Sequence, residues 1–383
     1  MFYMKKIEFF LHNINNDDLL RLNKVVKSIF LTTGTEVALF EQAFSKYLGI
    51  KQTVGVTSCT AALHLSLLAL GIGNGDEVIT TPMSFCATAN AILHAGAKPV
   101  FVDVEEDTGN MNAELIEAAI TEKTKAILPV HLYGQMCDME KIHEIASRYN
   151  LKIVEDAAHS IEASRAGLKP GQISDAACFS FYATKNITSG EGGAISTNNI
   201  NLAEGLRILR LHGIDKSAAD RYTEKYRHWD MPILGWKYNM DNIQASLLLG
   251  QLRRIDKLWE KRNQLWEYYE TLLKTIKEIE LLKTLPGLKH ARHLFTILVP
   301  AKRRDQILWS LQKNNIGVAV NYRPIHLLKY YRKSYGFKEG DFPVAEEIGK
   351  RTISLPLYPK LKKSQILYIV NVLKKIFAKN KRY

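Results

Sequence analysis

Residues 179–186 read FSFYATKN, and residues 189–193 follow with the turn sequence SGEGG. The apolar run predicts a strand over 177–181 with Lys185 at its end. An unpaired ammonium is costly to bury, so a lysine in this position needs a partner or a covalent role. Partial burial would lower its pKa from about 10.4 and make it a nucleophile toward a carbonyl group. Taken alone, the stretch favours a lysine whose charge reaches solvent over one with a covalent role.

The segments around this stretch alternate short apolar runs with helical patterns from about residue 54 to 200. Strands are predicted over 54–56, 77–80, 99–102, 126–130, 152–155, 177–181 and 193–197. Helices are predicted over 60–70, 84–95, 113–120, 139–149 and 202–209. This βαβ rhythm predicts an α/β fold in which a mainly parallel sheet lies between helices.

The pattern changes after about residue 241. Residues 241–273 predict one long amphipathic helix. Shorter elements follow, with strands over 293–299 and 317–320 and helices over 304–314 and 363–377. A chain of 383 residues is long enough for two domains. We therefore predict a large domain over residues 1–245 and a smaller α+β domain over residues 246–383.

Composition narrows the class of protein. No apolar run approaches the roughly 20 residues of a membrane span, and we expect a cytoplasmic protein without membrane contact. The four cysteines are widely spaced and match no zinc or redox motif, so no metal is expected. The net charge of +13 (52 basic minus 39 acidic residues) permits an anionic partner. Because the chain has no nucleic-acid-binding motif, we do not expect that partner to be nucleic acid.

Residues 57–64, TSCTAALH, form a hydroxyl-rich turn that leads from a predicted strand into an apolar helix. Free N–H groups at a helix N-terminus, together with hydroxyl donors such as that of Thr60, are suited to bind phosphate. An ordinary Ser/Thr helix cap is the more common use of such residues and stays open.

Residues 153–159, IVEDAAH, place Asp156 directly after a predicted parallel strand. Ligand sites of α/β proteins form at this carboxyl edge, where Asp156 could hold a protonated ring nitrogen and His159 could stack on the ring. The alternatives are a helix-capping aspartate and a satisfied core histidine. Phe85 could likewise stack on an aromatic cofactor, although a lone phenylalanine on an apolar helix usually belongs to the core.

A phosphate-binding turn, a strand-end aspartate and a lysine 29 residues beyond it (185 − 156) match the needs of pyridoxal 5′-phosphate (PLP). Over nearly its whole length the chain resembles the DegT/StrS-type sugar aminotransferases, which have the type I, aspartate-aminotransferase-like fold of PLP enzymes. The resemblance rests on ordered motifs, namely LTTG (31–34), FE (40–41), SCTAALH (58–64), GNGDEVI (73–79), HLYG (131–134), EDAAH (155–159), FSF (179–181), KNIT (185–188), GEGG (190–193), LHG (211–213) and YNM (238–240).

The resemblance implies a role for each candidate site residue. Lys185 would hold PLP as a Schiff base, and Asp156 would pair with the pyridine nitrogen. The cofactor phosphate would be bound by Thr60, the backbone of Ala61, and Ser180, while Phe85 stacks on the ring and His159 lies nearby. The asparagine that matches Asn239 reaches the phosphate of the neighbouring subunit's PLP, which implies a homodimer with shared active sites.

The resemblance also implies the reaction. An amino group would pass from L-glutamate, through pyridoxamine phosphate, to a nucleotide-diphosphate keto sugar. Dehydratase relatives carry histidine where this chain has Lys185, so transamination is favoured. The motifs KNIT (185–188) and LHGID (211–215) look closest to enzymes that aminate C4 of UDP-linked 4-keto (6-deoxy) hexoses for lipopolysaccharide or other surface glycans. The open alternatives are a dTDP-keto sugar, an inosose, or a non-catalytic PLP-fold binding protein.

Two further points concern the substrate. Arg227, Arg323 and His326 are candidates to contact the diphosphate, with a solvated surface role equally open for each. Residues 7–12, IEFFLH, depart from the usual opening of the family and leave any substrate contact there in doubt.

Overall fold

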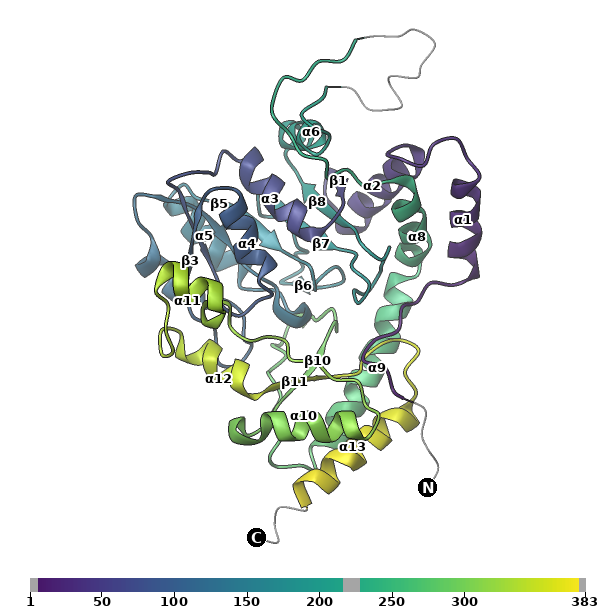
Figure 1. The fold of residues 1–383 in the computed structure, drawn as a ribbon, viewed down its shortest axis with the longest axis vertical. Coiled ribbons are helices and arrows are strands. Elements are labelled where there is room, and N and C mark those ends of the chain that lie inside the picture. The colour runs from purple at the N-terminus through teal and green to yellow at the C-terminus, as the bar shows by residue number, and fades with distance from the viewer. Residues whose placement is uncertain (1–5, 216–227, 379–383) are drawn as a thin grey trace.

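A computed structural model describes residues 6–215 and 228–378 of the chain. Its centre is a seven-stranded sheet with the order β1-β8-β7-β5-β4-β2-β3 (Figure 1). The strands are β1 (Gln52–Val56), β2 (Glu77–Thr80), β3 (Lys98–Phe101), β4 (Thr124–Leu128), β5 (Lys152–Asp156), β7 (Ala176–Ser180) and β8 (Gly193–Thr197). All seven overlap the predicted strands.

Strand direction explains where a site can form. Neighbours from β3 through β7 are parallel, whereas β8 is antiparallel to both β7 and β1. The carboxyl ends of β1, β5 and β7 therefore lie at the same edge of the sheet. The expected α/β class with a mostly parallel sheet is confirmed.

Helices cover both faces of the sheet. They are α1 (Asn16–Val26), α2 (Thr35–Leu48), α3 (Cys59–Ala69), α4 (Ala87–His94), α5 (Met139–Arg148), α6 (Ile200–Leu209) and α8 (Asn242–Arg253). Successive side chains of a strand point to opposite faces. Accordingly, Cys178 of β7 packs with α3 and α6, whereas its neighbours Ala177 and Phe179 pack with α2 and α8. A third core forms between α5 and the strands β4 and β5.

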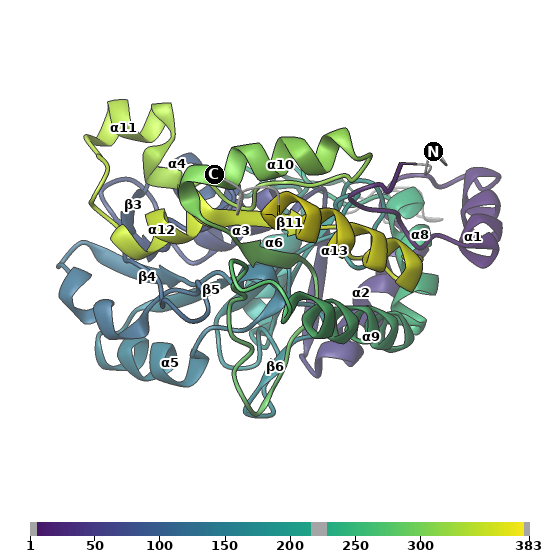
Figure 2. The same ribbon diagram turned by 90° about the horizontal axis from the view of Figure 1, so that it is seen from below.

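Most of the remaining described elements form a second layer of structure below the sheet edge (Figures 1 and 2). Its elements are α9 (Ile255–Leu273), β10 (Phe295–Leu298), α10 (Arg304–Lys313), α11 (Lys329–Tyr335), α12 (Pro343–Arg351), β11 (Thr352–Leu355) and α13 (Lys363–Ala378). Strands β10 and β11 pair antiparallel, and α9, α10 and α13 close a core over them. A further two-stranded ribbon joins β6 (Ser164–Arg165) to β9 (Leu288–Lys289).

Some predicted elements differ from the structure. The long helix predicted over 241–273 is interrupted at Arg254, whose backbone leaves helical geometry with φ −113° and ψ 14° and whose guanidinium binds Asp18 and the backbone oxygen of Asn13. The helix over 113–120 is two short 3₁₀ turns, held by i→i+3 hydrogen bonds. The strand over 317–320 is absent from the described residues, since only Ala319 bridges to β11. Helices α1, α2, α11 and α12 and strands β6, β9 and β11 were not predicted.

The division of the chain after residue 245 stays a prediction. Leu248, Leu252 and Ile255 pack in the core of α2, whereas the buried residues of α9 from Leu265 onward pack with β10 and α13. We propose from these cores that the boundary lies within the first turns of α9. Every helix among residues 6–215 and 228–378 is too short or too polar to cross a membrane.

Candidate active site

One cavity of about 560 Å³ opens at the carboxyl edge of the sheet. Six of the eight residues selected from sequence line it: Thr60, Phe85, Asp156, His159, Ser180 and Lys185. They come from the ends of β5 and β7, from the start of α3, and from loops between these elements. Residues far apart in the chain therefore face a single space, although their individual roles stay predictions.

The start of α3 forms one wall of the cavity. The side chain of Ser58 accepts a hydrogen bond from the backbone N–H of Ala61 at 3.1 Å and caps the helix. Gly193, at the start of β8, lies directly against this turn, and a Cβ atom there would come within 2.3 Å of the Ser58 carbonyl carbon. A glycine is thus required for β8 to approach the helix N-terminus, which is the kind of site that binds phosphate.

Lys185 lies in the turn between β7 and β8, not at the strand end that the sequence predicted. Strand β7 ends at Ser180, and the Lys185 backbone N–H donates to the Tyr182 carbonyl at 2.9 Å. Burial lowers the pKa of Lys185 to about 8, while Cys59 and Asp156 oppose this shift. An amine with such a pKa is partly neutral near pH 7 and can act as a nucleophile.

The lowered pKa predicts how fast Lys185 reacts with an aldehyde such as PLP in ligand-free protein. The neutral amine is the nucleophile, and it makes up about a tenth of Lys185 at pH 7, against less than about 0.1% of an ordinary lysine. The rate of imine formation should rise with pH and level off above pH 8. Stopped-flow absorbance from pH 6 to 10, with Lys185→Ala as the blank, measures this. A midpoint near 10.4 would contradict it.

Asp156 is the last residue of β5 and is buried beside the cavity. Its carboxylate accepts hydrogen bonds from the Thr88 hydroxyl at 2.8 Å and the Ala158 backbone N–H at 3.2 Å. Burial raises the pKa of Asp156, and Thr88, Ala158 and Lys185 partly oppose this rise. A buried carboxylate with so few donors is best stabilised by a cation in the cavity.

His159 is held on both ring nitrogens. Its Nδ1 accepts the backbone N–H of Tyr133 at 3.3 Å, so the neutral ring carries its proton on Nε2 and donates it to the Tyr322 hydroxyl at 3.2 Å. Burial, with the Lys185 charge as a smaller cause, holds the pKa of His159 well below its ordinary value. The ring is therefore a neutral, oriented plane beside Lys185.

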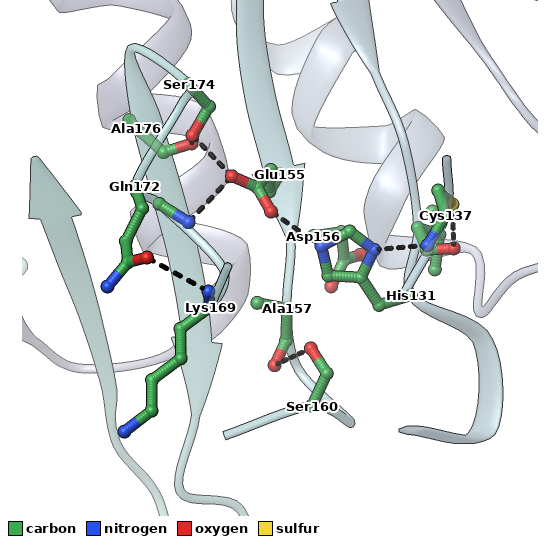
Figure 3. A network of polar contacts seen from close by, with 12 residues as sticks. His131, Cys137, Glu155, Asp156, Ala157, Ser160, Lys169, Gln172, Ser174 and Ala176 are labelled. Atoms are coloured by element: carbon green, nitrogen blue, oxygen red, sulfur yellow. Dashed lines mark hydrogen bonds and ion pairs between the residues drawn. The ribbon is translucent and has the colours of Figure 1, made fainter. Parts of the chain in front are cut away.

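A second buried pair lies behind Asp156 (Figure 3). His131 Nε2 and Glu155 Oε2 are 2.6 Å apart, and His131 Nδ1 accepts the Cys137 backbone N–H. The Ser174 hydroxyl donates to the other oxygen of Glu155. These contacts hold the turn that contains Tyr133, whose φ of 56° places its N–H on His159.

Two candidate residues lie outside the cavity lining. The Ala61 N–H is engaged by Ser58, and the Asn239 amide donates to the Thr33 hydroxyl at 2.7 Å. Arg227 lies outside the described residues. Arg323 is exposed, as a diphosphate contact would require. His326 is fully buried and bonded to Glu346, so neither role considered for it, diphosphate contact or solvated surface, holds.

The sequence analysis missed several residues of the cavity. Thr88, Asn321, Tyr322 and Phe9 all line it. Thr88 follows Phe85 by three residues, a spacing that could have indicated a shared helix start. Phe9 comes from the atypical N-terminal segment, which is held against Asn315 and Gly317 by backbone hydrogen bonds of Ile7. Because Tyr322 and Phe9 approach only through tertiary packing, no local motif marks them.

Comparisons with known proteins agree with this geometry. The chain is 37% identical over 374 residues to the UDP-4-amino-4-deoxy-L-arabinose–oxoglutarate aminotransferase of Shewanella sediminis, covering 95% of this chain and 96% of that protein. It is 30% identical to Helicobacter pylori PseC, an aminotransferase involved in pseudoaminic acid biosynthesis, with a TM-score of 0.91 and coverage of 98% and 100% of the two chains.

A third comparison concerns Spr1654 of Streptococcus pneumoniae, assigned as a sugar aminotransferase. Its PLP form is 32% identical, with a TM-score of 0.90 and coverage of 98% of this chain and 99% of that chain. Its pyridoxamine phosphate form is 33% identical, with a TM-score of 0.91 and coverage of 97% and 99%. The fold is thus that of PLP-dependent aminotransferases, as expected.

The family comparison covers almost the whole chain. The DegT/DnrJ/EryC1/StrS aminotransferase family matches residues 12–374, which include every residue selected for the site. The expected resemblance to sugar aminotransferases is confirmed, and with it an enzymatic function. The chain therefore belongs to the DegT/DnrJ/EryC1/StrS aminotransferase family.

Proposed function

We propose that this enzyme binds PLP at Lys185 and transfers the amino group of L-glutamate to a nucleotide-linked keto sugar. The observation that carries the proposal is the pairing of two groups in one cavity. Lys185 has a pKa of about 8, and Asp156 is a buried carboxylate in need of a cation. A carbonyl cofactor with a protonated ring nitrogen satisfies both groups.

The shape of the cavity supports this cofactor. Phosphate would lie at the N-terminus of α3, near Thr60 and Ser180, and the ring would lie between Phe85 and His159. Asp156 would meet the ring nitrogen at the carboxyl end of β5. The relative Spr1654 in its PLP and pyridoxamine phosphate forms supports the same assignment.

The protein groups then have defined tasks. When bound, PLP supplies an electron sink for the electron pair that remains when the donor loses its Cα proton. Once the donor has displaced it, Lys185 Nζ would take the proton from Cα of the donor and would deliver a proton to C4′ of the cofactor. Asp156 keeps the ring nitrogen protonated, and the Thr88 hydroxyl orients its carboxylate. In the second half of the reaction the same groups act in reverse on the keto sugar.

For the acceptor we propose C4 of a UDP-linked 4-keto (6-deoxy) hexose. The relative from S. sediminis is named for a UDP-4-amino sugar and oxoglutarate, which supports this position and this donor. Two exposed aromatic side chains line the cavity, Phe85 at 58% and Tyr182 at 47% exposure. Their rings could stack against the sugar or the nucleotide base of the substrate. All four cysteines are free, which supports a cytoplasmic location.

The test is a panel of UDP- and dTDP-4-keto sugars and an inosose, each supplied with L-glutamate and PLP-loaded enzyme. Amination is followed by mass spectrometry, and the position of the amine by NMR. A product aminated at C4 of a UDP sugar supports the proposal. Turnover of dTDP sugars or an inosose alone would move the assignment to those substrates, and failure to bind PLP would refute it.

We also propose a homodimer in which Asn239 serves the neighbouring site. Large apolar side chains are exposed on and around α1, at the edge of the large domain (Figure 1). They are Leu11, Leu19, Leu20, Val26, Ile29, Phe30, Leu31 and Leu39. Ile29 is 94% exposed, which is unusual for isoleucine unless a partner covers it. Asn239 is bonded to Thr33, within this region of the chain.

Mixing two inactive variants tests the shared site. Asn239→Ala should weaken PLP binding about 10–100-fold, the usual cost of a hydrogen bond to a charged group. A heterodimer of Lys185→Ala and Asn239→Ala subunits has one intact site if Asn239 acts on the neighbour. Unfolding and refolding an equal mixture should therefore restore about a quarter of wild-type activity at limiting PLP. No recovery would show that Asn239 acts within its own subunit.

A further inference from the structure

A buried row of polar side chains runs from α9 to His159. Arg262 of α9 pairs with Glu162, and neither side chain is more than 2% exposed. The other oxygen of Glu162 accepts a hydrogen bond from Asn186 Nδ2 at 2.8 Å. Asn186 Oδ1 lies 3.0 Å from His293 Nδ1, and the His293 ring stacks on His159 with the centroids 4.4 Å apart. Asn186 directly follows Lys185.

Each hydrogen bond of this row determines the next. Asn186 Nδ2 uses both hydrogens, one on Glu162 and one on the Ala291 carbonyl at 3.2 Å, so its oxygen must face His293. Because that oxygen can only accept, His293 carries its proton on Nδ1. The pKa of His293 lies well below the ordinary value, chiefly through burial and then through His159 and Lys185. Two neutral rings with determined tautomers therefore lie face to face.

Stability alone explains this arrangement poorly. The desolvation of a buried ion pair commonly exceeds its Coulombic gain. In addition, Nε and Nη1 of Arg262 have no hydrogen-bond partner in the structure. Such a costly group calls for another explanation, and the hydrogen bonds supply one, because Glu162 is the anchor from which Asn186 and His293 take their orientation.

We propose that His293 is a positioning residue: Asn186 sets the plane of its ring, and its ring, stacked on His159, sets the plane of the His159 ring beside Lys185. This inference rests on the proposed PLP site. Five of the described residues face His159. Lys185 comes from the turn after β7, Asp156 from the end of β5 and Tyr133 from the turn after β4. Tyr322 follows α10, and His293 precedes β10. Without His293 the ring of His159 keeps the hydrogen bonds at its two nitrogens and the more distant Tyr322 ring, whose centroid lies 6.1 Å away, against 4.4 Å for His293.

The chain offers a matched control in His290. It is 7% exposed, His293 is 6% exposed, and both have pKa values well below the ordinary one, with burial as the chief cause. His290, however, contacts Trp266 and accepts the Arg292 backbone N–H, and its hydrogen bonds and ring contacts within the described chain include neither Asn186 nor His159. His293→Leu and His290→Leu thus remove equally buried rings, and a general loss of packing would affect both alike.

The first measurement uses ligand-free protein. ¹⁵N NMR of histidine-labelled protein, with His159 assigned by a His159→Gln variant, should show one neutral Nε2–H tautomer for His159 at pH 7. His293→Leu should broaden or double the ring signals of His159, because the ring is no longer held in one orientation, and His290→Leu should leave them single and sharp. His293→Phe retains a flat ring and should restore the single set of signals. A single sharp set in His293→Leu, broadened signals in His290→Leu, or no rescue by His293→Phe would overturn the proposal.

The second measurement uses PLP-loaded enzyme. His293→Leu should lower kcat about tenfold or more, with KM for L-glutamate changed less than about twofold, since misplaced groups act on the chemical step. The pH midpoint of the cofactor's visible band should move by about half a unit or more. An unchanged midpoint and kcat would refute the positioning role. If the protein cannot be loaded with PLP, the proposed function fails, while the comparison of the His159 ring signals in ligand-free protein still decides this inference.

Discussion

Replacing Lys185 with Ala should lower kcat by at least about 10⁴-fold, because one residue supplies both the covalent attachment and the proton transfer. General acid–base transfer by a positioned group accounts for about 10²–10⁴ of this factor. The Lys185 amine lies on the cavity wall with a pKa of about 8. Asp156 is an oppositely charged group that lines the same cavity. Single-turnover kinetics with L-glutamate and visible absorbance of PLP-loaded protein measure the loss.

Lys169→Ala is the control for a second lysine with a lowered pKa. Burial also lowers the pKa of Lys169, but its ammonium donates to the Tyr47 carbonyl and lies over the Tyr47 ring, outside the cavity. This variant should keep kcat within about twofold, because the Lys169 ammonium contacts Tyr47 and lies outside the cavity. A visible PLP band that survives in Lys185→Ala, or is lost in Lys169→Ala, would transfer the role to another lysine.

Replacing Asp156 with Asn should lower kcat by about 10²–10³-fold, the usual loss when one electrostatic stabiliser of a transition state is removed. The amide has nearly the same shape and can still accept from Thr88, but it cannot keep the ring nitrogen protonated. KM for L-glutamate should change much less than kcat, because the defect lies in the chemical step. Steady-state kinetics in both half-reactions measure this separation.

The effect of Asp156→Asn on the stability of the folded protein has a predictable direction. Burial raises the pKa of Asp156 in the folded protein above its unfolded value. The stability that this group contributes is therefore fully present below the unfolded pKa of about 3.9 and is lost as pH rises through the raised pKa. At pH 7 the ligand-free Asp156→Asn protein should consequently have a Tm no lower than that of the wild type.

Asp175→Asn provides the matched control. Asp175 accepts the backbone N–H of Ile153 at 2.9 Å and pairs with Lys152, at the opposite end of β5 from Asp156. Its replacement should lower Tm but leave kcat almost unchanged. A loss of kcat in Asp175→Asn as large as that in Asp156→Asn would mean that both act through the strand, and the assigned role of Asp156 would be wrong.

Local sequence was a good guide to the sheet. All seven strands predicted over residues 54–197 overlap strands of the sheet, because the buried strands of such a sheet are short apolar runs between glycine- and asparagine-containing turns. Local sequence was a poor guide to secondary structure where a segment contacts residues far away in the chain. The helix predicted over 241–273 is interrupted at Arg254, which binds Asp18, and in residues 317–320 Gly317 is bonded to Ile7 while only Ala319 pairs with β11.

The residues of the candidate site likewise fall into those that local sequence could predict and those that it could not. Asp156, Ser180 and Thr60 could be placed beforehand, because strand ends and helix starts of an α/β sheet meet at one edge. Phe9 and Tyr322 could not, since their approach depends on how the two layers of the fold pack. His326 was misjudged for the same reason, since it is buried against Glu346.

By itself, the sequence determined the fold class, the lysine and aspartate of the site, and the family, all of which rest on local patterns and ordered motifs. The tertiary structure alone decided the surroundings that give Lys185 its reactivity. Its lowered pKa comes from burial, and its neighbour Asn186 is tied to α9 and to His293 through Glu162. Desolvation and ring orientation depend on atoms from segments more than 100 residues apart, such as His159 and Arg262, and no local pattern encodes their distance.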